Sequence, residues 1–320
     1  MVEDVKLAVI GCGYWGKNLA RNFAQLGALS AIVDPNPEIA KIHATAFKVP
    51  AMTMEEVLGD PSIKAIAIAA PAELHKSLAL EGIAAGKHIY VEKPLALSVT
   101  DGEIMRDAAK AADVVLMVGH LLQYHPVFVT LLEMVKAGDL GKLRYAYSNR
   151  LSIGKFRVEE NAFWSLAPHD ISMILSLFGE VPSEIRGGGL DFVTRGIADE
   201  ARLDLVFPNK GRAHIFVSWL HPFKEQRLVV VGDKAMAVFD DTAEWEEKLL
   251  LYRHEIDKNQ YPPEPIKSDA KAVFVPKGEP LKSECQHFLD CVKNGTTPIT
   301  DADEGLRVLR VLESLNLPSA

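Results

Sequence analysis

Short, continuously apolar segments alternate with longer helical patterns through the first 120 residues of the chain. Continuous apolar runs, rather than alternating ones, are typical of strands that are buried on both faces of a parallel sheet. The predicted strands are Lys6–Ile10, Ala28–Val33, Ala65–Ala69, His88–Val91 and Val114–Val118. The predicted helices are Tyr14–Leu26, Pro37–Phe47, Glu73–Ala85 and Asp101–Ala112. Repeated strand–helix units of this length predict a doubly wound α/β sheet.

After Gly119 the pattern changes to period two. Apolar and polar residues alternate over 143–150, 201–207 and 213–219, which predicts an open antiparallel sheet with one face on a core. The predicted helices in this half are Pro126–Ala137, His169–Phe178, Ser283–Lys293 and Asp303–Leu315. Five prolines between Tyr261 and Pro280 predict a surface excursion. We therefore expect two domains, 1–121 and an α+β domain 122–320, with the C-terminal helix packing back near the first.

Composition excludes several classes of protein. The 320 residues are 48% hydrophobic and 24% charged, as in globular proteins, and the formal net charge is −8. An acidic chain is a poor ligand for duplex nucleic acid, which requires a basic face. Three cysteines with no zinc spacing favour a reducing compartment and no metal site. The chain start does not resemble a signal peptide, and no apolar run approaches the roughly 20 residues of a membrane span, so we expect a cytoplasmic protein.

A glycine-rich turn follows the first predicted strand and precedes a helix. Gly11 permits a tight turn, Gly13 lets the backbone approach a pyrophosphate, and Gly16 allows close helix packing. The pyrophosphate would lie on free N–H groups at the helix N-terminus. The second strand ends in Asp34, 23 positions after Gly11, where a carboxylate accepts hydrogen bonds from both ribose hydroxyls and repels a 2′-phosphate. The sequence therefore predicts dinucleotide binding and favours NAD over NADP.

Some neighbours of this turn leave alternatives open. Asn36 or Lys41 could reshape the ribose pocket and relax the choice of NAD. Cys12, within the turn, is either a reactive thiol near a helix N-terminus or a small residue in a tight site, and the second interpretation is favoured.

Two further loops follow predicted parallel strands. Residues 69–75 follow the third strand, and Glu92-Lys93-Pro94 follows the fourth. Doubly wound sheets bind ligands at the carboxyl ends of their strands. A Lys93 ammonium aimed into that crevice could hydrogen-bond a substrate hydroxyl and favour a developing oxyanion.

Taken together, these residues resemble the Gfo/Idh/MocA family of glucose–fructose oxidoreductase and inositol dehydrogenase. The resemblance implies an N-terminal Rossmann domain with a Glu-Lys-Pro motif and a C-terminal antiparallel sheet that carries the substrate. It also implies an NAD-dependent oxidoreductase that forms a homodimer or homotetramer. The residues then expected at the cofactor are Gly11, Gly13, Tyr14, Trp15, Gly16, Asp34, Pro71, His75, Glu92, Lys93 and His120.

The resemblance points to a second catalytic element, roughly Asp-x-x-x-His at the start of a helix. Here His169 falls on the histidine position, while Ser165 occupies the place of the usual Asp. Neutral imidazole suits the removal of a hydroxyl proton. Either His169 or Lys93 is therefore the base, and His169 could instead be a helix cap or a substrate ligand. Asp170 is adjacent to His169, and helix N-terminal capping is the alternative role for its carboxylate.

The residues around Trp15 and Trp164 resemble most closely the nucleotide-sugar 3-dehydrogenases of the UDP-N-acetylglucosamine type. That resemblance implies hydride transfer from the sugar C3 hydroxyl to NAD. The substrate residues expected on this hypothesis are Tyr124, Arg150, Lys155, Arg157, Trp164, Ser165 and Asp170, the three basic ones as partners of a diphosphate. Two alternatives stay open: a dehydrogenase of a free sugar or inositol, and a non-catalytic NAD-dependent sensor.

Overall fold

The computed structural model describes residues 5–154, 156–315 and 317. These residues form two compact units. Unit 1 combines the described residues up to Tyr124 with Glu279–Arg310, and unit 2 combines His125–Gly278 with the described residues from Val311 onward. The sequence led us to expect one boundary, after residue 121. Residues 279–310 nevertheless belong to unit 1, because they bury apolar side chains such as Phe288 in its core.

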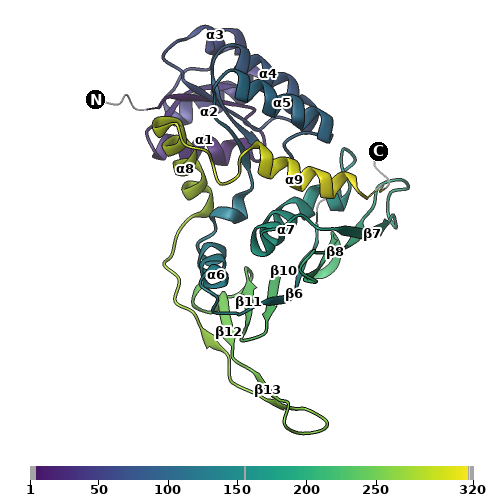
Figure 1. Ribbon diagram of the computed structural model, residues 1–320. Helices are drawn as coiled ribbons and strands as arrows, with labels where there is room; N and C mark the ends of the chain where they lie inside the picture. Colours follow the sequence, from purple (N-terminus) through teal and green to yellow (C-terminus); the bar gives the residue numbers. More distant parts are fainter. Residues whose placement is uncertain (1–4, 155, 316, 318–320) are drawn as a thin grey trace. The chain divides into compact units, whose positions relative to one another are not determined.

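Unit 1 is a parallel sheet flanked by helices (Figure 1). The five strands follow the order β2-β1-β3-β4-β5, and every pair is parallel, as the continuous apolar runs predicted. The strands are β1 (Leu7–Ile10), β2 (Leu29–Val33), β3 (Ala65–Ile68), β4 (His88–Glu92) and β5 (Leu116–Gly119). The helices are α1 (Gly16–Gln25), α2 (Pro37–Phe47), α3 (Met54–Gly59), α4 (His75–Ala84), α5 (Val99–Ala111), α8 (Pro280–Asn294) and most of α9 (Ala302–Glu313), with 3-10 turns η1 (Ala72–Leu74) and η2 (Leu121–Tyr124). The residues of α9 from Val311 onward belong to unit 2.

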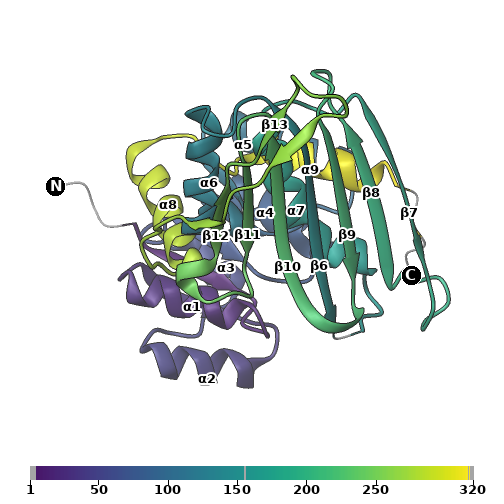
Figure 2. The same ribbon diagram turned by 90° about the horizontal axis from the view of Figure 1, so that it is seen from below.

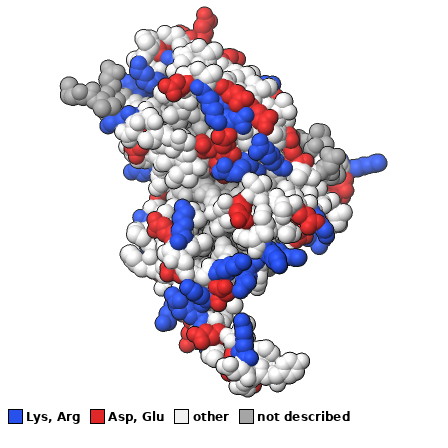
Figure 3. Space-filling view, in the orientation of Figure 1, with Lys and Arg blue, Asp and Glu red and all other residues white. Residues whose placement is uncertain are grey.

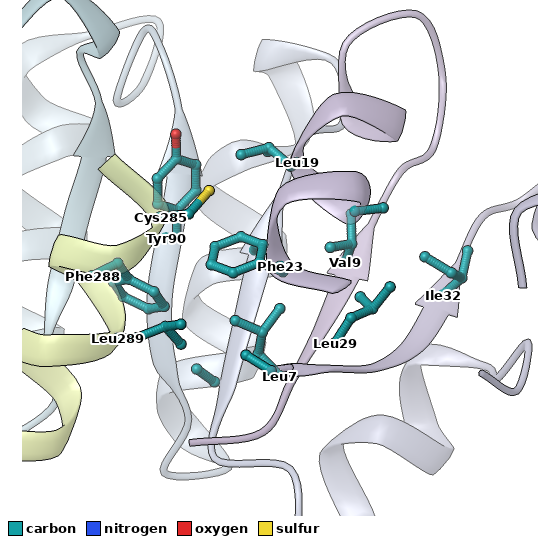
Figure 4. Close-up of a cluster of buried hydrophobic side chains, with 14 of the residues drawn as sticks. Leu7, Val9, Leu19, Phe23, Leu29, Ile32, Tyr90, Cys285, Phe288 and Leu289 are labelled. Atoms are coloured by element: carbon teal, nitrogen blue, oxygen red, sulfur yellow. The ribbon is translucent and has the colours of Figure 1, made fainter. Parts of the chain in front are cut away.

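The core of unit 1 brings together the sheet, helix α1 from the N-terminal part of the chain and helix α8 from its C-terminal part. Phe23 of α1, Tyr90 of β4 and Phe288 of α8 are fully buried and meet edge to face, with ring centroids 5.8–6.4 Å apart. Figure 4 shows α8 beside this cluster, with Cys285 and Phe288 directed toward Tyr90. The apolar face of α8 thus covers the sheet next to α1.

Ion pairs also attach α9 to α5. Asp303 accepts from Lys110 at 3.0 Å, and Arg310 donates to Glu103 at 3.1 Å. Over the part of unit 1 where α5 lies, Figure 3 shows basic and acidic side chains mixed rather than gathered by sign. Exposed pairs of this kind each contribute about 0–1 kcal/mol, so the apolar contacts carry most of the attachment.

Unit 2 is a mixed sheet with helices on one face (Figure 2). The eight strands follow the order β15-β12-β11-β10-β6-β9-β8-β7, and α7 packs against β6, β8 and β9. The pairing is antiparallel throughout except between β6 and β9, which are parallel. The fold class predicted from the sequence is confirmed, with this parallel pair as the feature that period-two patterning does not reveal.

The elements of unit 2 are as follows. The helices are α6 (Pro126–Lys136) and α7 (Ala162–Phe178), with the 3-10 turn η3 (Trp245–Glu247). The strands of the large sheet are β6 (Leu143–Ile153), β7 (Glu184–Leu190), β8 (Glu200–Val206), β9 (Arg212–Ser218), β10 (Leu220–Gly232), β11 (Met236–Asp240), β12 (Leu249–Tyr252) and β15 (Lys271–Ala272). A separate hairpin pairs β13 (Glu255–Asp257) with β14 (Glu264–Ile266), inside the segment expected as a surface excursion.

Helix α7 begins earlier than the sequence indicated. We expected its start at His169, and Pro168, which lacks an N–H, generally disfavours a helix interior. The helix instead begins at Ala162 and includes Pro168, and the side chain of Asn161 caps it by accepting from the Trp164 N–H at 3.0 Å. His169 therefore lies in the second turn of a buried helix rather than at a helix end.

Among the described residues, no helix has both the length and the apolar character needed to cross a membrane.

Candidate active site

The glycine turn after β1 has the geometry that a dinucleotide requires. Gly11 has φ +88°, and a Cβ on it would lie 2.9 Å from the carbonyl oxygen of Ala69. A Cβ on Gly16 would overlap the carbonyl oxygen of Gly11, so the helix start approaches the strand as closely as backbone allows. Gly13 faces open space on its Cβ side, with no atom within 4 Å. This open position beside the N-terminus of α1 fits a pyrophosphate.

Asp34 at the end of β2 shapes the same turn. Its carboxylate accepts from the backbone N–H of Cys12 at 2.8 Å and from that of Asn36 at 2.9 Å. The Asn36 side chain accepts from the Glu38 N–H at 3.0 Å and caps α2. Asn36 is thus engaged within the helix cap, whereas Asp34 lies beside the turn, where the sequence predicts a carboxylate for the ribose hydroxyls.

Cys12 has the chemistry of a packed residue. It is 1% exposed, and burial, followed by the charge of Asp34, raises the pKa of its thiol to about 12. A thiol that holds its proton at neutral pH is a poor nucleophile. This agrees with the interpretation of Cys12 as a small residue in a tight site.

The two aromatic residues of the turn differ. Tyr14 is 85% exposed, and the ammonium group of Lys17 lies over its ring, 5.6 Å from the centroid. Trp15 is partly exposed, and its indole Nε1 donates to Glu92 Oε1 at 2.5 Å. Glu92 is the first residue of the Glu-Lys-Pro motif, so this hydrogen bond ties the turn after β1 to the end of β4.

Glu92 is an unusual carboxyl group because it is almost fully buried. Burial raises its pKa, while the Trp15 hydrogen bond, the positive charge of Lys93 and the Lys93 N–H at 3.3 Å act in the opposite direction. Lys93 itself is partly exposed at the carboxyl edge of the sheet. The motif therefore presents a lysine at this edge with a buried carboxyl group behind it.

His75 joins two of the loops at the carboxyl edge. It is 1% exposed, and its ring nitrogens lie 2.8 Å from the Pro94 carbonyl oxygen and 3.0 Å from the Ala70 carbonyl oxygen. Burial lowers the pKa of its imidazole, and the two carbonyl groups oppose that shift. The sequence predicted that His75 contacts the cofactor. The structure instead shows its polar atoms engaged by backbone, while Pro71 in the same loop is exposed.

Two other predicted site residues are buried. His120 at the end of β5 is 1% exposed, and its Nδ1 lies 2.5 Å from a carboxylate oxygen of Glu304 on α9. Tyr124 is 6% exposed, and its hydroxyl lies 2.9 Å from that of Thr300. Both side chains thus hold the C-terminal segment on unit 1. No signal within 1–124 indicated Glu304 or Thr300, because both partners come from the last fifth of the chain.

In unit 2, the second predicted catalytic element lies on α7. Ser165 and His169 are four residues apart, so they share one face of the helix. Ser165 is buried, whereas His169 and Trp164 are partly exposed. A base must be accessible to its ligand, and the partial exposure of His169 agrees with that requirement.

The residue after His169 fixes this helix to the sheet. Asp170 is 1% exposed and accepts from Ser148 Oγ at 2.5 Å, and from the Nε and Nη2 groups of Arg150 at 2.6 and 3.2 Å. Ser148 and Arg150 lie on β6. Asp170 was expected at the substrate or as a helix cap, and in the structure it is a buried anchor between α7 and β6.

The two described basic residues that were expected to hold a diphosphate, Arg150 and Arg157, form ion pairs with carboxylates. Arg150 pairs with Asp170, and exposed Arg157 pairs with Glu160 at 2.9 Å. Lys155 lies outside the described residues. Within the described part of the chain, no cluster of three or more His, Cys, Asp or Glu side chains could hold a metal ion.

Known proteins share both halves of this arrangement. Residues 5–120 match the model described as "Oxidoreductase family, NAD-binding Rossmann fold", and residues 128–238 match the "GFO/IDH/MocA C-terminal domain". UDP-N-acetylglucosamine 3-dehydrogenase of Acidithiobacillus ferrooxidans is 25% identical over 95% of this chain and 94% of its own length. The scyllo-inositol 2-dehydrogenase (NAD(+)) of Bacillus subtilis is 27% identical over 95% of this chain and 91% of its own length.

A solved structure of the Acidithiobacillus ferrooxidans UDP-N-acetylglucosamine 3-dehydrogenase superposes with a TM-score of 0.86, at 24% identity, over 98% of this chain and 97% of that chain. This likeness bears on the fold. With the glycine turn, the two family models define an NAD-binding oxidoreductase with a C-terminal mixed-sheet domain. The chain belongs to the Gfo/Idh/MocA family.

Proposed function

We propose that this protein oxidises a secondary hydroxyl group of a sugar or cyclic polyol, with transfer of the hydride to NAD. The observation that carries the proposal is the common carboxyl edge of unit 1. The glycine turn after β1, the loop after β3 and the Glu-Lys-Pro motif after β4 follow neighbouring strands of one sheet. Gly11 approaches the Ala69 backbone so closely that a Cβ would not fit, and the Trp15 indole donates a hydrogen bond to Glu92, so the three segments lie together. Ligands of doubly wound sheets bind at this edge.

The cofactor supplies the hydride acceptor when it is bound. The protein must then orient the alcohol and take its proton. Lys93, as an ammonium group, donates a hydrogen bond to the reacting oxygen and favours negative charge there. The buried carboxyl group of Glu92 lies next to Lys93 in the chain, and the positive charge of Lys93 favours the anionic form of that carboxyl group. We therefore assign the proton to the imidazole of His169, because imidazole is the side chain generally suited to take up a proton in this pH range.

A nucleotide sugar oxidised at C3 of a UDP-N-acetyl-hexosamine is the first candidate substrate. It is supported by the similarity to UDP-N-acetylglucosamine 3-dehydrogenase over nearly the whole chain. The residues around Trp15 and Trp164, on which the resemblance to that class depends, lie at the glycine turn and on α7.

A free inositol is the second candidate, and one observation favours it. Arg150 and Arg157, the two described basic residues expected at a diphosphate, already pair with Asp170 and Glu160. A polyol needs no such cation. The similarity to scyllo-inositol 2-dehydrogenase covers the chain equally well.

The test is NADH formation, followed by absorbance, with UDP-N-acetylglucosamine, scyllo-inositol, myo-inositol and unphosphorylated hexoses. For the substrate that turns over, Lys93→Met should lower kcat by about 10²–10³-fold. His169→Asn should lower it by about 10²–10⁴-fold and remove the acidic limb of the pH profile. Lys64→Met is the matched control, because exposed Lys64 lies just before β3, at the opposite edge of the sheet.

Each result bears on a separate part of the proposal. Full activity of Lys93→Met would exclude the assigned role of that lysine. Turnover of UDP-N-acetylglucosamine without turnover of inositols would select the nucleotide sugar, and the reverse would select the polyol. If the protein binds NAD and oxidises none of these compounds, the enzyme assignment is wrong and the sensor alternative replaces it.

A further inference from the structure

Two glutamates far apart in the sequence meet in the core of unit 1. Glu92 lies at the end of β4, and Glu284 lies in the second turn of α8. The hydroxyl of Tyr90 lies between them, 2.9 Å from Glu284 Oε2 and 3.3 Å from Glu92 Oε1. Glu92 is 8% exposed, Glu284 1% and Tyr90 0%. Two carboxyl groups and one phenol thus form a line away from water.

The two carboxyl groups have unequal surroundings. Glu92 has the indole N–H of Trp15 at 2.5 Å, the backbone N–H of Lys93 at 3.3 Å and the positive charge of Lys93. Glu284 has Tyr90 alone, and its second oxygen is buried without a hydrogen-bond partner among the described residues. Burial raises the pKa of both groups, and the charge of Glu92 raises that of Glu284 further.

The groups that face Glu284 from the packed elements are all neutral or acidic. They are Tyr90 and Glu92 on β4, Tyr124 on η2 and Cys285 on α8 itself. The nearest arginine on α1, Arg21, acts on Cys285 and is paired with Glu279. Two neighbouring carboxyl groups in a dry site cannot both ionise, and the proton stays on the one that lacks donors.

Local packing holds this line of groups in place. A Cβ on Gly119, at the end of β5, would lie 2.8 Å from Tyr90 Oη and 3.0 Å from Glu92 Oε2. Figure 4 shows the Tyr90 ring between α8 and the α1 side of the cluster, with Cys285 of α8 next to it. Glycine at position 119 thus leaves just the space that the phenol and the Glu92 carboxylate occupy.

We propose that Glu284 is a positioning residue that carries a proton at neutral pH and, through Tyr90, holds Glu92 as the anion between Lys93 and the indole of Trp15. The protonated Oε2 of Glu284 donates to Tyr90 Oη, and the Tyr90 hydroxyl donates to Glu92 Oε1. Both hydrogen bonds then donate in the direction of Glu92, which carries the single negative charge of the line. The Glu92 carboxylate is next to Lys93 of the Glu-Lys-Pro motif and accepts from Trp15 of the glycine turn. The inference about Lys93 rests on the proposed function, whereas the effect on the NAD turn does not.

The protonation state is tested by difference infrared spectroscopy on protein labelled with [δ-¹³C]glutamate. At neutral pH the wild-type protein should show the carbonyl stretch of a protonated glutamic acid, and Glu284→Gln should remove it. Asp290→Asn is the control, because Asp290 is an exposed acid on the same helix, and it should keep the band. Absence of the band, or its survival in Glu284→Gln, would overturn the proposal.

Positioning is tested separately from packing. Glutamine imitates the protonated acid, so Glu284→Gln should bind NADH within about twofold of wild type and keep the Trp15 indole N–H signal in ¹H–¹⁵N spectra. Glu284→Leu removes the donor and should fold stably, since replacing a buried polar group by an apolar one is often neutral or stabilising. It should still shift the Trp15 signal and weaken NADH binding by about 3- to 10-fold, the net value of one hydrogen bond.

A folded Glu284→Leu protein with wild-type NADH affinity and an unmoved Trp15 signal would contradict a positioning role. If that variant fails to fold, Tyr90→Phe breaks the same line with almost no change in volume, and the same two readouts apply. None of these measurements needs a substrate. They can therefore succeed even if the Lys93 substitution leaves turnover unchanged, which separates this inference from the proposed function.

Discussion

The two units of the protein bury an acidic side chain in opposite ways. Asp170 in unit 2 and Glu284 in unit 1 are each 1% exposed. Asp170 receives a hydroxyl hydrogen bond from Ser148 and two N–H groups from Arg150. Glu284 faces a second carboxyl group and the hydroxyl of Tyr90, and no described cation pairs with it.

The difference indicates two uses of a buried acid. A carboxylate with its own arginine is a fixed ion that holds two elements together, and here it attaches α7, which carries His169, to β6. A carboxyl group next to another carboxylate must keep its proton and acts as a donor. The first arrangement fixes the helix for which we propose a catalytic role, and the second underlies the proposed anion at Glu92.

The largest effect is expected from removal of the arginine of unit 2. Arg150→Met leaves Asp170 buried without its counterion, which should lower the free energy of unfolding by about 3–5 kcal/mol. Urea unfolding measures the loss, and hydrogen exchange should rise in peptides of α7 and β6 but not in those of β4 and α8. Arg157→Met, which breaks an exposed pair, should cost about 0–1 kcal/mol. Equal stability losses in the two variants would show that Asp170 does not depend on Arg150.

Arg150 also shows what local sequence can and cannot predict. The sequence placed Arg150 next to Lys155 and Arg157 and so suggested a diphosphate site. In the structure its partner is Asp170, 20 positions away on another element. Which basic residue is free for a ligand depends on tertiary pairing, and pairing between a strand and a later helix leaves no periodic signal. Similarly, Pro168 disfavoured a helix interior locally, whereas the cap at Asn161 and burial of α7 prevailed.

In unit 1 the sequence predicted the elements and the glycine turn because these obey local rules. Apolar runs define the strands, Gly11 and Gly16 meet steric demands within a few residues, and Asp34 ends its strand. Glu284 was not predicted. Its contact with Tyr90 spans 194 positions, and within α8 it reads as an ordinary polar position of an amphipathic helix. Glu284 is buried only because α8 packs on the sheet, and this tertiary contact cannot be predicted from the sequence of the helix.

A smaller effect should measure how far the two donors to Asp170 depend on each other. Ser148→Ala removes one donor to the Asp170 carboxylate and should cost about 1.5–3 kcal/mol, the value for a hydrogen bond to a charged group. Ser148 and Arg150 position the same carboxyl group, so in the Arg150→Met background the same substitution should cost less, about 0.5–1.5 kcal/mol. A double-mutant cycle of unfolding free energies measures the coupling, with Ser152→Ala on the same strand as the control. An equal cost in both backgrounds would mean that Ser148 and Arg150 hold Asp170 independently of each other.

The smallest expected effect is the change with pH in the free energy of unfolding that Glu284 contributes. The folded-state pKa of Glu284 is raised above its usual 4.5 by burial and by the charge of Glu92, so folding favours the protonated form. Such a group contributes stability that is fully present below its unfolded-state pKa and is lost as the pH rises toward its folded-state pKa.

Glu284→Gln has no proton to lose at this position. Its stability relative to wild type should therefore increase as the pH rises above about 4.5, by up to about 1.4 kcal/mol per pH unit. Urea unfolding of both proteins at several pH values measures this slope, with Asp290→Asn as the parallel control. A difference that is constant with pH would mean that Glu284 ionises in the folded protein as it does in the unfolded chain, and the contrast with Asp170 would then be one of geometry rather than of charge.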